Sequence, residues 1–151
     1  DKIAEENEGP VRRERLIQRR KEALKLMRIL KAYNPILVGS VWRGTAHRGS
    51  DIDIAVYHDK PDDILKTLKQ NNLKIMGTEW MTVTKKGREK TSFHIYSESS
   101  AKEKIEFIVR SIEETHPKER CEIYGDEITG LRVQELEKLI KENPTQRFVP
   151  S

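Results

Sequence analysis

The spacing of hydrophobic and polar positions along the 151-residue chain predicts a long helix near its N-terminal end. After Gly9-Pro10, apolar residues recur at helical spacing, which predicts a helix from Val11 to about Tyr33. Pro35 disfavours helical backbone at the residue before it and should end this helix. The acidic and polar residues 1–9 are expected to form a flexible N-terminus. The apolar positions of the helix are Leu16, Ile17, Leu24, Met27, Ile29 and Leu30.

Shorter apolar runs predict five strands and three further helices. A strand that ends at Gly39 precedes one or two helical turns over residues 40–46. The polar KKGREK segment joins two alternating runs, so we expect a hairpin, and a hairpin forces an antiparallel pair. The order of elements predicts an α/β (α+β) fold with a mixed β-sheet flanked by helices. The strands lie in PILVGS, SDIDIAVY, EWMTVTKKGREKTSFHIYSE and EKIEFIVRSI, and the other helices in PDDILKTLKQNN and LRVQELEKLIKEN.

Length and composition place these elements in a single domain. A chain of 151 residues suits one domain, expected over residues 10–143 and followed by a C-terminal tail at 144–151. No apolar run approaches the roughly 18 residues of a membrane span, and no signal peptide is visible, so we expect no membrane association. The single cysteine, Cys121, excludes an internal disulfide and a cysteine-rich zinc site, and it fits a cytoplasmic protein.

Basic residues cluster within the predicted first helix. The formal net charge is +4, and the cluster suggests two interpretations. Charge runs are usually solvated helix faces. The alternative is a surface that contacts a phosphate backbone, whose binding would weaken with salt. The residues concerned are Arg12, Arg13, Arg15, Arg19, Arg20 and Lys21.

Two aspartates interrupt the apolar pattern of residues 50–57. Strand alternation puts Ile52, Ile54 and Val56 on one face and leaves Asp51 and Asp53 together on the other, about 7 Å apart along the strand. Like charges in this position repel each other, and a divalent cation between them relieves the repulsion. Carboxylate oxygens are the ligands that Mg²⁺ prefers. The alternative is that Asp51 caps a turn and Asp53 simply faces solvent.

A glycine-serine pair precedes these aspartates. Gly39-Ser40 closes a buried strand and opens a predicted helix, so backbone N–H groups and the serine hydroxyl would point outward as an anion site. An anion site beside a divalent-cation site is what a nucleoside triphosphate with Mg²⁺ requires.

The segment GSVWRGTAHRGSDIDIAV resembles the signature of the polymerase-β-type nucleotidyltransferases, a Gly-Ser followed after a spacer by Asp-x-Asp. With RGT inside the spacer, it looks most like the palm domain of archaeal CCA-adding tRNA nucleotidyltransferases. FHIYSESSAKEKIEFIV is similar to the stretch of that palm in which His-x-Tyr precedes the strand with the third carboxylate. The resemblance covers about residues 36–110 and implies a nucleotidyltransferase palm fold.

The resemblance implies that three carboxylates on neighbouring strands hold two Mg²⁺ ions, with Mn²⁺ as an alternative. One ion lowers the pKa of the attacking hydroxyl and the other clamps the triphosphate and stabilises the departing pyrophosphate. Asp51 and Asp53 would be two of the ligands. The third would be Glu106, which strand alternation separates from the apolar face of Ile105, Phe107 and Val109, with Glu103 as the reserve candidate. The family residue here is Asp, so the longer glutamate arm must fold back.

The same resemblance implies a nucleotide site. Ser40 would contact the β- and γ-phosphates and Arg43 would neutralise them, although an exposed helix charge is the alternative interpretation of Arg43. Gly39 and Gly44 would allow close approach of the backbone, and Thr45 is a further nucleotide candidate.

Other conspicuous residues receive plainer interpretations. His94 lies in the HIY match and has the strongest functional alternative among the histidines. Trp42 either packs or stacks on a base, and Arg48 is expected to be exposed. The histidines show no metal-ligand spacing and are expected to be structural or exposed: His47, His58, His94 and His116.

By this resemblance we expect a template-independent nucleotidyltransferase that transfers NMP from ATP or CTP to a hydroxyl, with an RNA or tRNA-like 3′ end favoured. The chain has no room for the tRNA-binding domains of the CCA-adding enzymes, so we expect a minimal nucleotidyltransferase. RNA addition would then need a partner, a homo-oligomer or a further part of the chain. The alternatives are an antitoxin-type AMP transferase that acts on tyrosines of a partner ribonuclease, an aminoglycoside-modifying enzyme, and a non-catalytic nucleotide- or RNA-binding module.

Overall fold

A five-stranded mixed sheet forms the centre of the molecule. The computed structural model describes residues 2–47, 49–114 and 130–148. The strands lie in the order β1-β2-β5-β4-β3, with β2 and β5 parallel and the other neighbours antiparallel. This arrangement confirms the predicted α/β fold with a mixed sheet. The strands are β1 (Ile36–Val38), β2 (Ile52–Tyr57), β3 (Lys74–Lys85), β4 (Arg88–Glu98) and β5 (Lys104–Arg110).

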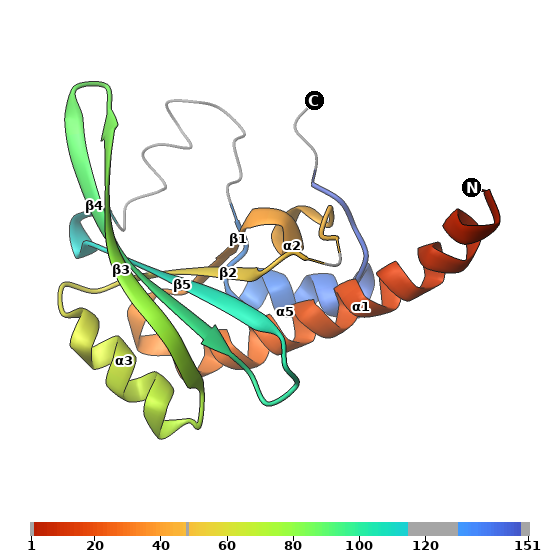
Figure 1. Cartoon of the computed structure of the whole chain (residues 1–151), viewed down its shortest axis with the longest axis horizontal. Helices are drawn as coiled ribbons and strands as arrows, with labels where there is room; N and C mark the ends of the chain where they lie inside the picture. Colours follow the sequence, from red (N-terminus) through yellow and green to blue (C-terminus); the bar gives the residue numbers. More distant parts are fainter. Residues whose placement is uncertain (1, 48, 115–129, 149–151) are drawn as a thin grey trace.

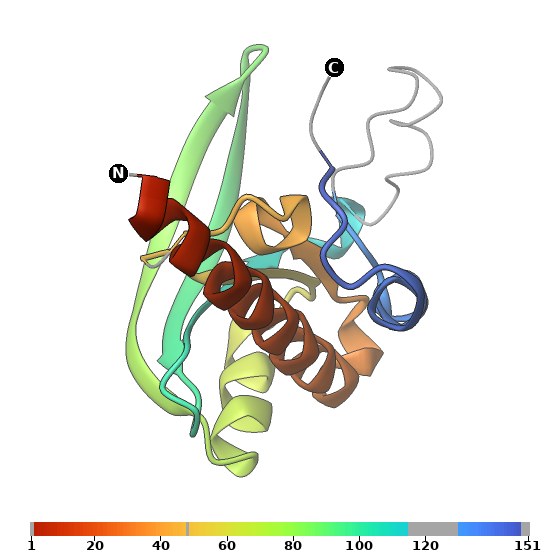
Figure 2. The ribbon, with the colours of Figure 1, turned by 90° about the vertical axis from the view of Figure 1, so that its right-hand side faces the viewer.

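Helices cover the apolar face of this sheet. α1 and α5 lie side by side beneath the sheet, and α3 packs against the same core (Figures 1 and 2). Ile52, Ile54 and Val56 of β2 are fully buried there, as their alternation predicted. The opposite face of β2 and β5 therefore carries the polar residues. The helices are α1 (Lys2–Ile29), α2 (Gly39–Arg43), α3 (Pro61–Gln70) and α5 (Val133–Glu142), with 3₁₀ turns at Lys31–Tyr33 and Ile112–Glu114.

The first helix begins earlier than its sequence pattern predicted. α1 runs from Lys2 through Pro10, so the predicted start at Val11 is wrong. A proline inside a helix removes one backbone hydrogen bond and can be accommodated by a bend. The flanking Ala, Glu and Arg residues are good helix formers, which favours continuation on both sides. The helical backbone ends at Tyr33 and Asn34 turns to φ 50°, as Pro35 predicted.

The β3–β4 hairpin extends beyond the rest of the sheet (Figure 1). Its turn is Lys86-Gly87, both with positive φ, as a two-residue hairpin turn requires. β3 is an edge strand, and several large apolar side chains on it are exposed. They are Met76, Trp80, Met81 and Val83, between 40% and 63% exposed. No helix in the described part of the chain is long and apolar enough to span a bilayer.

Arg19 and Arg20 correct the interpretation of the basic cluster as one solvated face. Arg20 is fully buried and Arg19 is 2% exposed, whereas the other four members are exposed. Arg20 lies at the junction between α1, α2 and the segment that follows α5. Its guanidinium donates four hydrogen bonds of 2.8–3.0 Å to backbone carbonyls, those of Val41, Trp42, Pro144 and Gln146. Burial lowers its pKa to about 10, so it stays charged at neutral pH.

These hydrogen bonds make Arg20 the residue that connects α1, α2 and the segment after α5. We expect Arg20→Met to lower the free energy of unfolding by about 3 kcal/mol or more, because several buried carbonyls lose their donors at once. Denaturant unfolding followed by circular dichroism measures the change. The matched control is Arg12→Met on the same helix, where an exposed side chain should shift stability by no more than about 0.5 kcal/mol. Equal stability of the two variants would contradict the assigned role.

Candidate active site

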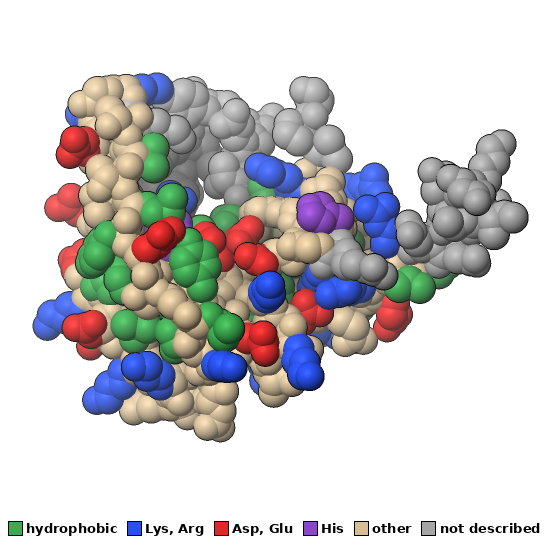
Figure 3. Space-filling model, in the orientation of Figure 1, with side chains coloured by type: hydrophobic (Ala, Val, Ile, Leu, Met, Phe, Trp, Pro, Cys, Tyr) green, Lys and Arg blue, Asp and Glu red, His purple; other side chains and the backbone are tan. Residues whose placement is uncertain are grey.

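Two carboxylates lie side by side on the polar face of the sheet. Asp53 of β2 and Glu106 of β5 are directly paired in the parallel register. Neighbouring strands are about 4.8 Å apart, so the two side chains leave the same face at adjacent positions. Tyr96 of β4 is the next residue along this row, opposite Glu106. Figure 3 shows acidic side chains gathered in the middle of this face, between the hairpin and α2.

Gly39 lies directly against Asp53. Val38, the last residue of β1, pairs with Asp53, and the chain then turns into α2 at Gly39 with φ 74°. A Cβ at this position would collide with Asp53 Oδ2. The Gly-Ser turn and the Asp-x-Asp strand, which are separated in sequence, therefore meet in space, and only glycine fits both the backbone and the space.

Electrostatic repulsion is concentrated on Asp53. Its pKa is raised to about 7, first by burial and then by the negative charges of Glu106 and Asp51. Asp51 is half-buried immediately before β2. A buried carboxyl beside two others binds a proton more readily because the charged form is disfavoured. A divalent cation at this position would relieve the same strain.

The donor set fits a hard divalent cation only in part as the side chains are placed. The carboxylate oxygens of Asp53 and Glu106 are the ligand type that Mg²⁺ and Mn²⁺ prefer, and the contact with Gly39 leaves the Asp53 carboxylate closely confined. Across residues 2–47, 49–114 and 130–148, however, no three His, Cys, Asp or Glu side chains form a group that could hold a metal ion. Asp51 is near enough to act on Asp53 electrostatically without completing such a group.

Glu103, the reserve third carboxylate, has a different environment. It accepts a hydrogen bond from Arg19 Nε at 3.3 Å, and its other oxygen lies 3.8 Å from Arg15 Nε. Arg19 also donates to the backbone carbonyl of His47 at 2.9 Å. Glu103 thus joins the loop before β5 to α1, and the register assigns the position beside Asp53 to Glu106.

The predicted nucleotide residues all lie in or directly after α2. Ser40 is half-buried in its first turn, and its carbonyl accepts hydrogen bonds from the N–H groups of Gly44 and Thr45 at 2.9 and 3.0 Å. Arg43 is exposed at the end of α2, with its guanidinium carbon 5.5 Å from the ring centroid of Trp42. Gly44 is buried with φ 82°, and Thr45 is exposed.

Trp42 packs, as one of its two interpretations predicted. Its side chain is 7% exposed and its ring stacks on Phe148 with centroids 6.2 Å apart. The N–H of Phe148 donates to the carbonyl of Arg43 at 2.8 Å, so the segment after α5 lies along α2. Arg48, His116 and Cys121 lie outside the described residues.

Sequence reasoning undervalued one residue beside the carboxylates. His94 is 8% exposed, and its Nδ1 lies 3.1 Å from Glu106 Oε2. Tyr96 donates to Glu79 Oε1 at 2.8 Å, and this bond with its surroundings raises the pKa of Tyr96 to about 12. The HIY match placed His94 near the site, but the pattern carried no sign of which partner its ring would meet.

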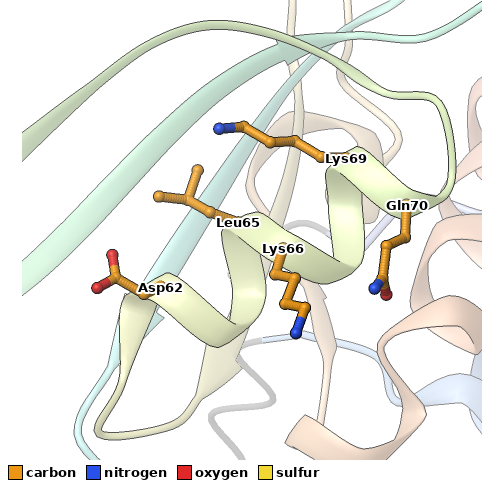
Figure 4. A pocket seen from close by; sticks show the side chains of 5 residues that line it. All are labelled: Asp62, Leu65, Lys66, Lys69 and Gln70. Carbon is orange, nitrogen blue, oxygen red and sulfur yellow. The ribbon is translucent and has the colours of Figure 1, made fainter.

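Two surface hollows are lined by neither Asp53 nor Glu106. One lies along α3, where its lining includes Leu65, which is half-buried against the core (Figure 4). The lining residues are Asp62, Leu65, Lys66, Lys69 and Gln70. α3 packs on the apolar face of the sheet, so the sheet separates this hollow from the carboxylates.

Comparison with known proteins identifies one related group. A family model described as a nucleotidyltransferase domain matches residues 14–129. The matched range contains Gly39, Ser40 and all the candidate carboxylates. No curated protein and no solved structure matches the chain. The resemblance read from the sequence is therefore confirmed at the level of the family, and closeness to the archaeal CCA-adding enzymes stays a prediction.

The contact between Gly39 and Asp53 leads to a stability prediction. Gly39→Ala should cost more free energy of unfolding than Gly87→Ala, by about 1 kcal/mol or more, as measured by denaturant unfolding. Both glycines have φ near 75°, but a Cβ at Gly87 meets no atom within 4 Å, so the comparison isolates the clash.

A second mutation shows whether Asp53 causes that difference. In an Asp53→Ala background the extra cost of Gly39→Ala should become smaller, because the obstructing carboxylate is gone and only the closely placed Cβ of residue 53 remains. If the two mutations were additive, the contact would not be responsible.

Proposed function

The chain belongs to the nucleotidyltransferase domain family, and from that premise we propose that it transfers a nucleoside monophosphate from an NTP to a hydroxyl without a template. The acceptor oxygen forms a bond to the α-phosphorus, the bond to the β-phosphate oxygen breaks, and pyrophosphate and the hydroxyl proton leave. ATP or CTP is the proposed donor, and an RNA or tRNA-like 3′ end is the favoured acceptor.

The pairing of Asp53 with Glu106 beside Gly39 is the observation that carries this proposal. With Asp51, these side chains would hold Mg²⁺, in two ions as the resemblance implies, and Mn²⁺ would substitute. Bound at this position, the ions would neutralise the triphosphate and lower the pKa of the attacking hydroxyl. The protein contributes a fixed arrangement of carboxylates on paired strands, which orients reactants at small entropic cost.

The turn into α2 would receive the phosphates. Gly39 and Gly44 both have positive φ and closely packed surroundings, so the backbone of this turn has one conformation. Ser40 would donate its hydroxyl to the β- and γ-phosphates, and the exposed Arg43 can swing toward them from the end of α2. Thr45, also exposed, would add a contact to the nucleotide.

Exposed basic side chains support an RNA acceptor. Arg12, Arg13, Arg15 and Lys21 are exposed along α1, where they could contact a phosphate backbone. This surface would make RNA labelling decrease as the salt concentration rises.

A partner protein is the second candidate acceptor, and the edge strand β3 favours it. Four large apolar side chains are exposed on this strand, defined above, and an exposed apolar edge is typical of a surface that another chain covers. The chain would then transfer AMP to a side-chain hydroxyl of that partner. A non-catalytic binding module remains the outcome if no transfer occurs.

Labelled nucleotides test the proposal. Each α-labelled NTP is incubated with the protein, Mg²⁺, total cellular RNA and a protein lysate from the cells that supplied the RNA. The labelled polymer is then identified. We expect the label to appear in RNA. Asp53→Ala and Glu106→Gln should each reduce the rate of incorporation by at least about 100-fold, because each removes a group that stabilises developing charge.

The matched control is Glu89→Gln, which removes an exposed carboxylate from β4 far along the hairpin and should leave the rate unchanged. Label in protein instead of RNA would identify the second candidate. Full activity of Asp53→Ala would remove the proposed roles of the carboxylates.

A further inference from the structure

The ring of His94 is held at both nitrogens on the polar face of the sheet. Nδ1 lies 3.1 Å from Glu106 Oε2, and Nε2 lies 2.8 Å from Ser92 Oγ. The side chain is 11% exposed, so these two contacts replace most of the water that the ring would otherwise bind. The orientation of the ring is therefore fixed by one partner on its own strand and one on β5.

The contact with Glu106 has a defined direction. A carboxylate that binds a cation is ionised and can only accept hydrogen bonds, so in that state Nδ1 carries the proton and donates it to Glu106 Oε2. In the neutral ring Nε2 accepts from the Ser92 hydroxyl, and in the charged ring it donates to the same oxygen. The bond to Glu106 is thus the same in both charge states.

Another carboxylate is closer to His94 in register but is engaged elsewhere. Glu79 lies directly opposite His94 on β3, yet its Oε1 accepts from Tyr96 Oη at 2.8 Å. The ring is paired with the carboxylate that neighbours Asp53 and not with the nearer strand partner.

A glutamate in this position requires such a partner. Its side chain has one more rotatable bond than that of aspartate, so holding it in one rotamer costs more conformational entropy. A hydrogen bond from a buried ring to Oε2 fixes the arm and engages only one of the two carboxylate oxygens.

We propose that His94 is a positioning residue that holds Glu106 ready to bind a divalent cation. The inference rests on the proposed function, because it takes Glu106 as a cation ligand. Partners of this kind orient ligands, and their loss usually costs 10–100-fold in metal affinity or activity.

Metal binding tests the role without relying on turnover. Mn²⁺ alone is titrated into the protein and its dissociation constant is measured by electron paramagnetic resonance. His94→Leu should weaken Mn²⁺ binding about 10- to 100-fold and lower kcat by a similar factor, with KM for the NTP changed less than about threefold. His94→Asn, whose amide N–H lies near the position of Nδ1, should recover most of both.

A double-mutant cycle separates positioning from a general structural effect. Aspartate at position 106 is too short to reach the ring, so His94→Leu in the Glu106→Asp background should weaken Mn²⁺ binding less than about threefold. Equal effects in the two backgrounds would overturn the proposal. Circular dichroism melts of each variant show that the compared proteins are folded.

The failures of the two proposals are distinguishable. If Glu106→Gln weakens Mn²⁺ binding and His94→Leu does not, positioning by His94 is overturned and the proposed function stands. If Glu106→Gln itself leaves Mn²⁺ affinity and activity unchanged, Glu106 is not a ligand and both proposals are overturned.

Discussion

Repulsion between carboxylates that the sheet does not allow to separate is the constraint on which the candidate site depends. Asp53 is paired with Val38 on one side and with Glu106 on the other, and the apolar faces of β2 and β5 are buried against the helices. Moving the two acids apart would break strand pairing and expose core. The cost appears instead in the pKa of Asp53, which is raised to about 7. A carboxylate whose pKa is raised in this way by its neighbours is typical of a site that binds a cation.

The surroundings of the carboxylates stabilise this arrangement from three directions. Gly39 allows the turn into α2 to lie against Asp53, and Arg20 ties the end of α2 to α1 and to the segment after α5. On the other side of the row, His94 holds Glu106. Each contact joins elements that are distant in sequence, so the turn into α2, the strand pair and the hairpin form one structure around the acids.

Much of this fold and part of the site could be predicted from the sequence. Alternation in IDIAV and in IEFIV assigned the buried faces correctly because it reports only which side of a strand meets the core. It could not report what lies across the sheet. The pairing of Asp53 with Glu106, the ion pairs of Glu103 and the burial of Arg20 depend on register and helix packing, which local pattern does not encode. The predicted helix start after Pro10 is wrong for a different reason. The helix-forming residues on both sides of Pro10 allow the helix to continue through it.

The most direct test of the account is the pH dependence of stability with and without a divalent cation, for the wild-type protein and Asp53→Asn. The folded-state pKa of Asp53 is raised from 3.8 to about 7, so its stabilising contribution is present below pH 3.8 and is lost as pH rises through 7. Without metal, Asp53→Asn should match the wild type near pH 4 and melt about 3 °C or more higher at pH 8. Adding Mg²⁺ at pH 8 should raise the melting temperature of the wild type only. Parallel curves, or equal Mg²⁺ effects on both proteins, would contradict the central claim.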